Sequence, residues 1–266
     1  MSSPIPPVAA TRTGKPTRYL DPTAAYDLWS AVYDTDGNIL QALDTIEMRS
    51  LLPDLLSRLP HHQAWKIVDL GCGTGRNSVQ LLEVPEATII CLDASPKMLE
   101  IAIKRLAERM TALDCASTKA KAFQAIVYDM LSSSPLPPSA LDADALISTL
   151  VLEHIPLVEF FRTLSQILKP GGFALVTNMH SEMGAISQAG FVDPETGEKV
   201  RPKSYGHRLE DVIAEAERQE FQVVGAVDER VMDEEMAERL GERAKKWIGV
   251  TVWFGVCFRK VFSIIT

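Results

Sequence analysis

The chain has no apolar run near the roughly 18–20 residues that a membrane-spanning helix requires. Its first residues are rich in Pro, Ser, Thr and Ala and lack the apolar segment of a secretory signal. Both absences argue against membrane insertion and against secretion. We therefore expect a cytoplasmic protein.

Cysteine is also scarce. The four cysteines, Cys72, Cys91, Cys115 and Cys257, lie far apart and form no C-x-x-C pair. Disulfide frameworks and zinc sites use cysteines at short, regular spacings. The sequence therefore predicts four separate thiols, with no disulfide framework and no metal site.

Basic residues are outnumbered by acidic ones, with 27 Lys and Arg against 35 Asp and Glu, which gives a net charge of −8. A protein that binds nucleic-acid phosphates or an anionic membrane needs a basic surface. The charge therefore predicts no nucleic-acid partner. The chain is 46% apolar and 23% charged, as is usual for a folded globular protein.

The chain divides into a short leader and one large domain. Residues 1–18, with four prolines, predict a flexible leader, and residues 19–262 predict a single domain. Residues 19–60 have helical spacing, and Pro53 either kinks that segment or begins a second short helix.

Strands and helices then alternate to the end of the chain. Strands are predicted at 66–70, 87–93, 122–128, 144–150, 173–178, 221–228 and 251–260. Helices are predicted at 76–82, after Ser95-Pro96, from Phe160 to Lys169, at 208–220 and at 234–246. This order predicts a Rossmann-like α/β three-layer sandwich, with a mainly parallel seven-stranded sheet and helices on both faces.

A glycine-rich turn follows the first of these strands, in the sequence V-D-L-G-C-G-T-G at residues 68–75. Glycines in such a turn let the backbone approach a ligand closely, and a helix N-terminus supplies free N–H groups. Arg76 stands where a dinucleotide-binding turn has its third glycine, and no Lys-Ser/Thr pair follows as in a phosphate loop.

Three successive predicted strands each have an aspartate within them or at their carboxyl end. These are Asp69, Asp93 and Asp129. A carboxylate in the position of Asp93 accepts the hydroxyls of a ribose in nucleoside-binding sheets. A group of acids with no basic residue among them disfavours a pyrophosphate and suits a neutral or cationic ligand.

In their order along the chain, these segments resemble the class I methyltransferases that use S-adenosylmethionine. The segments that carry the resemblance are V-D-L-G-C-G-T-G, L-D-A-S-P-K-M-L, Y-D-M, S-T-L-V-L-E-H-I and L-K-P-G-G. The stretch Y-D-L-W-S-A-V-Y-D at residues 26–34 is similar to the small-molecule branch that includes ubiquinone/menaquinone-type and malonyl-carrier methyltransferases.

The resemblance implies S-adenosylmethionine as cofactor, S-adenosylhomocysteine as product and a set of cofactor-binding residues. Asp69, Gly71, Gly73, Gly75 and Thr149 would surround the amino-acid end of the cofactor, and Asp93 would bind the ribose. Ala94, Met98, Asp129 and Met130 would contact the adenine, and Tyr26 and Tyr33 would belong to a lid formed by residues 19–60.

The resemblance also implies an insertion at residues 180–207 that roofs the pocket of a small organic methyl acceptor. His207 and His154 are the candidate catalytic residues, because an imidazole titrates near neutral pH. The alternatives are that His154 has a structural role and that His207 caps the following helix. Residues 178–180 are further candidates for the pocket wall, and His61 and His62 are predicted to be solvated.

The expected reaction is an in-line displacement that moves a methyl group to the acceptor. Two alternatives stay open: a non-methylating reaction, pericyclic or lyase-type, on the same fold, and a cofactor-binding module without catalysis. Interleaved charges at residues 233–246 predict a solvated helix face. The sequence predicts neither the acceptor nor the oligomeric state.

Overall fold

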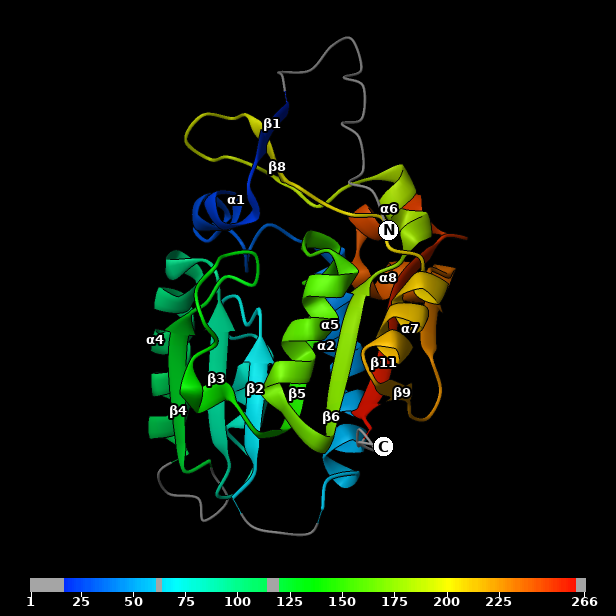
Figure 1. Cartoon of the computed structure of the whole chain (residues 1–266). Helices are drawn as coiled ribbons and strands as arrows, with labels where there is room; N and C mark the ends of the chain where they lie inside the picture. The colour runs from blue at the N-terminus through cyan, green and yellow to red at the C-terminus, as the bar shows by residue number, and fades with distance from the viewer. Residues whose placement is uncertain (1–16, 61–63, 114–119, 262–266) are drawn as a thin grey trace.

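Five parallel strands form the centre of the computed structural model, which describes residues 17–60, 64–113 and 120–261 (Figure 1). They lie in the order β4-β3-β2-β5-β6. Their bounds are β2 Lys66–Leu70, β3 Thr88–Asp93, β4 Ala122–Val127, β5 Ala143–Thr149 and β6 Leu168–Met179. From β2 the chain moves first to one side of the sheet and later to the other, so the carboxyl ends of β2 and β5 flank the position where ligands bind in such sheets.

Three antiparallel strands complete the sheet. β11 (Thr251–Lys260) pairs with β6, while β9 (Phe221–Val223) and β10 (Asp228–Val231) both pair with β11. The mainly parallel sheet predicted from the sequence is confirmed. It has eight strands instead of seven, because a turn with Gly225 at φ +81° divides the strand predicted at 221–228.

Helices cover both faces of the sheet, because its central strands are nearly continuous buried runs whose side chains point alternately to the two faces. Val68 and Leu70 pack on the face covered by α5 (Leu157–Ile167) and α7 (Leu209–Arg218). Ile67 packs on the other face, which is covered by three helices. These are α2 (Ile39–Ser57), α3 (Ser78–Leu81) and α4 (Pro96–Ala112). The predicted three-layer sandwich is therefore confirmed.

A smaller sheet lies over the carboxyl ends of the parallel strands, beside α1 (Pro22–Trp29) (Figure 1). In it β1 (Thr17–Leu20) runs parallel to β8 (Lys199–Pro202), which pairs with β7 (Phe191–Val192). The predicted leader therefore ends two residues too late, because Thr17 and Arg18 pair with Lys199 and Val200. The rest of the leader lies outside the described residues, as do His61, His62 and Cys115.

Several predicted boundaries differ from the structure. α2 continues through Pro53 to Ser57 as one helix, so no second helix begins there. β6 already begins at Leu168, inside the last turn of the predicted helix and five residues before the strand predicted from Phe173. The helix predicted at 234–246 is broken at Gly241, whose φ of +92° ends α8 (Glu234–Leu240) before the 3₁₀ helix η3 (Glu242–Trp247).

The remaining elements are short: η1 (Pro138–Ala140), η2 (Leu152–His154) and α6 (Ser181–Ile186). Within the described ranges, none of the helices combines the length and the apolar character needed to cross a membrane.

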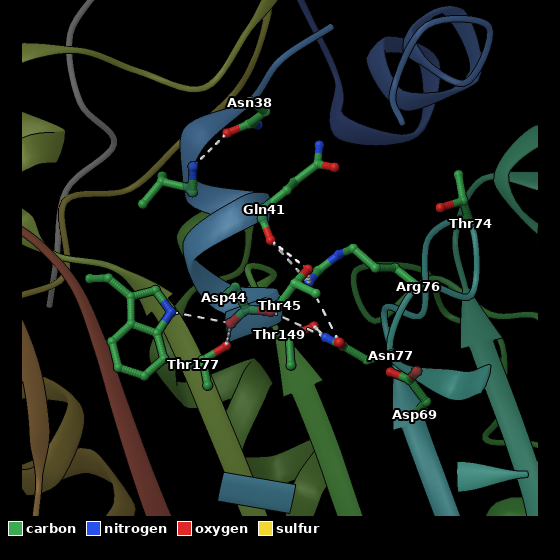
Figure 2. A network of polar contacts seen from close by, with 12 residues as sticks. Asn38, Gln41, Asp44, Thr45, Asp69, Thr74, Arg76, Asn77, Thr149 and Thr177 are labelled. Carbon is green, nitrogen blue, oxygen red and sulfur yellow. Dashed lines mark hydrogen bonds and ion pairs between the residues drawn. The ribbon is translucent and has the colours of Figure 1, made fainter. Parts of the chain in front are cut away.

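A buried carboxylate fastens α2 to the edge of the sheet. Asp44, 0% exposed, receives hydrogen bonds at Oδ1 from Thr177 Oγ1 (2.5 Å) and Trp253 Nε1 (3.1 Å). Its Oδ2 accepts from Arg76 Nη2 (2.8 Å) and Asn77 Nδ2 (3.2 Å). Figure 2 shows these side chains converging from α2, the glycine-rich turn and the ends of β5 and β6. The one carboxylate thus holds α2, the turn, β6 and β11 in fixed positions.

We expect Asp44→Ala to lower the free energy of unfolding by about 3–5 kcal/mol, because Arg76 would lose its buried carboxylate partner. Urea denaturation measures this change. Asp54→Ala is the matched control, since Asp54 forms an ion pair with Arg58 on the exposed surface of the same helix and its loss costs about 1 kcal/mol or less. Equal effects of the two substitutions would contradict the assigned role of Asp44.

Candidate active site

A cavity of about 600 Å³ opens where the carboxyl ends of β2, β3, β4 and β5 meet α1; we call it the main cavity. It contains nine of the twelve predicted cofactor-binding residues. These nine are Tyr26, Tyr33, Gly71, Gly73, Asp93, Ala94, Asp129, Met130 and Thr149. His154 lines it as well. The other three, Asp69, Gly75 and Met98, are not among its lining residues.

The glycine-rich turn forms one wall of the main cavity. The N–H groups of Gly71 and Cys72 both donate to the carbonyl of Leu92, at 2.7 and 3.0 Å, and thereby tie the turn to β3. Gly71 has a φ of +77°, and a Cβ on it would lie 2.3 Å from Val151 Cγ2. A side chain at this position is therefore excluded both by the backbone conformation and by the close approach of Val151.

Gly75 and Asp69 support this wall from behind. Gly75 has a φ of +77°, and a Cβ on it would lie 3.2 Å from Ala102 Cβ, so Gly75 allows α4 to lie close to the turn. Asp69 is buried, and its Oδ2 accepts a hydrogen bond from Ser78 Oγ (2.5 Å), while Oδ1 has no partner. Burial raises the pKa of Asp69 to about 7.

Asp93 is held in a fixed orientation at the end of β3. Its Oδ2 accepts from the N–H of Gly73 and its Oδ1 from the N–H of Ser95, both at 2.8 Å. Burial raises the pKa of Asp93 to about 6, although both backbone hydrogen bonds act in the opposite direction. The carboxylate is therefore positioned before any ligand arrives, and it retains lone pairs for a ligand.

Three of the other predicted residues have clear local roles. Asp129 accepts the N–H of Leu131 at 2.8 Å, which fixes the turn after β4. Thr149 accepts from Asn77 Nδ2 at 2.9 Å and is thereby connected to the Asp44 network (Figure 2). Met98 is fully buried and packs with Trp29 and Phe191, so it supports residues 21–36, which we call the covering segment, without lining the cavity.

The residues of the main cavity fit S-adenosylmethionine. Of the described residues, its lining includes four carboxylates, Asp21, Asp27, Asp93 and Asp129, and no Lys or Arg. The unpartnered Oδ1 of Asp69 adds a fifth acid directly behind the turn. The negative charge of these carboxylates attracts a sulfonium cofactor that has no phosphates, whereas it repels a pyrophosphate.

A smaller cavity of about 160 Å³, the side cavity, is lined by residues of α1 and η3, among others. Tyr26, Tyr33 and Leu150 line both cavities and therefore separate them. Burial raises the pKa of both tyrosines well above the usual value, so both stay protonated near neutral pH. The side cavity also contains Glu153, whose Oε2 is buried without a partner.

His154 lies at this dividing wall. Its Nδ1 is 2.9 Å from the carbonyl of Lys203, and its Nε2 is 2.8 Å from Tyr26 Oη. Because a carbonyl only accepts, Nδ1 carries the proton, and in the neutral ring Nε2 accepts the Tyr26 hydroxyl proton. Oε1 of Glu153 lies 3.5 Å from the same Nε2.

His207 and Tyr205 do not reach either cavity. His207 is 3% exposed, its Nε2 donates to the carbonyl of Ile155 (2.9 Å), and its ring stacks on Tyr205. Burial lowers the pKa of His207, so the ring is neutral near pH 7. The capping alternative is also wrong, because no side chain caps α7. A catalytic role for His207 therefore has no support in this geometry.

Residues 178–180 divide between different surroundings. Met179 lines the side cavity as predicted, whereas His180 lines a separate surface pocket and caps α6 by accepting the N–H of Glu182 at 3.2 Å. The solvated face predicted for 233–246 is confirmed for its charged side chains, which are all exposed, although the single helix predicted there is wrong. Arg243, Lys246 and Trp247 line the side cavity, because the break at Gly241 turns η3 toward it.

Sequence reasoning missed the side-cavity residues Lys199, Arg243, Lys246 and Gln188, and it gave no separate role to Glu153. One available signal was Gly241, a helix breaker in the middle of the predicted helix. The position of Lys199 had no such signal, since it depends on the pairing of β1 with β8.

Comparisons with known proteins agree with this geometry. Residues 67–172 match the family described as "Methyltransferase domain". The chain is 49% identical over 266 aligned positions to an uncharacterized methyltransferase of Emericella nidulans, covering 91% of this chain and 92% of the relative. It is 38% identical over 122 residues to a trans-aconitate 2-methyltransferase of Methylobacterium nodulans, covering 45% of this chain and 40% of that relative.

Solved structures agree in fold. The magnesium protoporphyrin IX methyltransferase of Synechocystis, solved with bound SAH, superposes with a TM-score of 0.56 over 90% of this chain and 94% of its own. The two sequences are 14% identical. This likeness concerns the fold alone.

We expect the affinity for S-adenosylmethionine to rise with pH between about 5 and 8 and to level off above that range. Asp93 and Asp69 have pKa values of about 6 and about 7, so at lower pH their protons must leave before a cation binds. Each such proton weakens binding by up to about tenfold per pH unit. Isothermal titration calorimetry across this range measures the effect.

Asp69→Asn removes the titrating group with the higher pKa. The affinity for S-adenosylmethionine should then change less with pH above about pH 6. Asp54→Asn, far from the cavity on the exposed side of α2, should leave the profile unchanged. An affinity that is constant or falls as the pH rises would show that these carboxyls do not face the bound cation.

Proposed function

This chain belongs to the class I S-adenosylmethionine-dependent methyltransferases, and we propose that it methylates a small organic acceptor bound in the side cavity. The main observation behind this proposal is the pair of cavities that share Tyr26, Tyr33 and Leu150 as a common wall. A methyl group moves from donor to acceptor by in-line displacement, which requires two adjoining binding sites.

We propose that the main cavity holds the cofactor, which supplies an electrophilic methyl group on a sulfonium. Asp93 binds the ribose hydroxyls, Gly71 and Gly73 leave room for the amino-acid end, and Asp69 adds negative charge behind them. Ala94, Asp129 and Met130 surround the adenine, and Thr149 orients the amino-acid end. The field of these carboxylates supports the assignment, because the cofactor is cationic.

Residues 19–60 act as a lid in this proposal, and residues 180–207 act as the roof of the acceptor site. Tyr26 and Tyr33 from the first segment, and Gln188 and Lys199 from the second, line the side cavity. The trans-aconitate methyltransferase that matches part of the chain supports a small acceptor. A cytoplasmic location is likewise our proposal, supported by the free thiols of Cys72, Cys91 and Cys257.

Tyr26 and His154 take the proton of an acceptor hydroxyl in this proposal. The Tyr26 hydroxyl donates to His154 Nε2, which leaves its oxygen lone pairs to accept a proton from the side cavity. As the acceptor oxygen bonds to the methyl carbon, its proton moves to Tyr26 Oη and the Tyr26 proton moves to His154. The resulting imidazolium is stabilised by the carbonyl of Lys203 and by Glu153 Oε1.

The function is tested by incubating the full chain with S-adenosylmethionine that carries a deuterated methyl group and with a small-molecule cell extract. We expect release of S-adenosylhomocysteine and an equal amount of a product that carries the deuterated methyl. Asp93→Ala should weaken cofactor binding at least about tenfold, whereas Asp54→Ala should not. Cofactor binding with no released S-adenosylhomocysteine would contradict methyl transfer to a small molecule.

His154→Gln and Tyr26→Phe should each lower kcat by about 10²–10⁴-fold, because each interrupts the same proton path. The double variant should be no slower than the slower single variant, since the two residues act as one unit. Additive losses, or an unchanged kcat, would argue against this relay.

A further inference from the structure

Three cationic side chains line the side cavity: Lys199 from β8, and Arg243 and Lys246 from η3. Segments far apart in the sequence thus bring their cations to one opening. Lys246 Nζ lies 4.9 Å from the centroid of the Trp247 ring, which is buried in the wall. Arg243 Nη1 donates to the main-chain carbonyl of Asp36, which fixes the guanidinium beside the covering segment.

These cations line one cavity with no ion pair to neutralise them in the part of the chain that the structure describes. Among the residues that the structure describes, none of the three forms an ion pair with a carboxylate, whereas the neighbouring Lys245 pairs with Glu242. The pKa of Lys199 is lowered by burial and by the charges of Arg201 and Lys246. In a chain with a net charge of −8, this is a local excess of positive charge.

A buried guanidinium adds to this field. Arg201 is 8% exposed, and its Nη1 donates only to the neutral atoms Gln188 Oε1 (3.3 Å) and Tyr19 Oη (3.4 Å). Its Nε is buried with no hydrogen-bond partner. A Cβ on Gly190, in the cavity wall, would lie 2.8 Å from Arg201 Cγ, so Arg201 lies directly behind that wall.

The two carboxyl groups of the side cavity, Asp36 and Glu153, offset only part of this charge, since three cations line the same cavity. Asp36 uses Oδ2 to accept from Trp29 Nε1 (2.7 Å) and Oδ1 to accept from the N–H of Asn38 (3.0 Å). Glu153 lies beside His154 at the wall shared with the main cavity. The side cavity therefore has one cationic end, and its other end adjoins the main cavity.

We propose that the methyl acceptor is a small anion, a carboxylate or a phosphate ester, whose anionic group is held by Lys199, Arg243 and Lys246. This inference rests on the proposed function, because it assigns the acceptor of that reaction. The anionic group and the attacking atom lie at opposite ends of the side cavity, the latter beside Tyr26. The two cavities then have opposite charge, which matches a cationic cofactor and an anionic acceptor.

The first test uses the full chain, deuterated S-adenosylmethionine and a small-molecule cell extract divided on an anion-exchange resin. We expect S-adenosylhomocysteine release from the retained, anionic fraction. Lys199→Gln and Lys246→Gln should each raise KM about tenfold or more and leave kcat nearly unchanged. Lys245→Gln is the matched control, because it removes an exposed charge from the same helix outside the cavity. Turnover from the unretained fraction, or equal KM for all three variants, would overturn the inference.

If the cofactor binds but neither fraction is turned over, the proposed function itself is contradicted. A second test then decides whether the anion site exists. The chain saturated with S-adenosylhomocysteine is titrated calorimetrically with trans-aconitate and, separately, with inorganic phosphate. Binding of either probe, weakened about tenfold or more by Lys199→Gln/Lys246→Gln and retained by Lys245→Gln, would support an anion site of that chemistry. Binding of neither probe would overturn it.

Discussion

The four hydrogen bonds received by Asp44 are the interaction on which the rest of the site depends. α2 leads directly from the segment that carries Tyr26 and Tyr33, and Asp44 fixes this helix against Arg76 of the glycine-rich turn, Thr177 of β6 and Trp253 of β11 (Figure 2). A buried carboxylate is tolerated only when its oxygens are satisfied, as they are here. The position of the covering segment over both cavities is therefore tied to the same buried group that orders the edge of the sheet.

The active site is organised by separation of charge. Carboxylates line the main cavity and lie behind its glycine-rich turn, while three cations line the side cavity and a buried guanidinium lies behind its wall. The shared wall consists of two protonated tyrosines and Leu150, which carry no formal charge. Leu150 has a φ of +57°, an unfavourable conformation for a leucine, and it is held by a hydrogen bond from its N–H to the carbonyl of Thr177 (2.9 Å). Backbone strain thus coincides with the point where the two cavities meet.

The sequence predicted the parts of the molecule that depend on local patterns. The parallel strands, the glycine-rich turn and the acids near the strand ends follow from periodicity and from turn chemistry, and nine predicted residues line the main cavity. The failures concern contacts between distant segments. His207 is the last residue of the roof segment, whose position depends on the pairing of β1 with β8. The same pairing places Lys199 at the side cavity. The single helix predicted at 234–246 is wrong because helical periodicity does not reveal the break at Gly241, after which Arg243 and Lys246 reach the side cavity.

The most direct test of the account is a crystal structure of the chain with S-adenosylhomocysteine. We expect the ligand to fill the main cavity with its ribose at Asp93, its adenine between Ala94 and Met130, and its sulfur on the side of Tyr26 and Tyr33 that leads to the side cavity. A ligand bound elsewhere, or a sulfur turned away from the shared wall, would contradict the assignment of the two cavities to donor and acceptor.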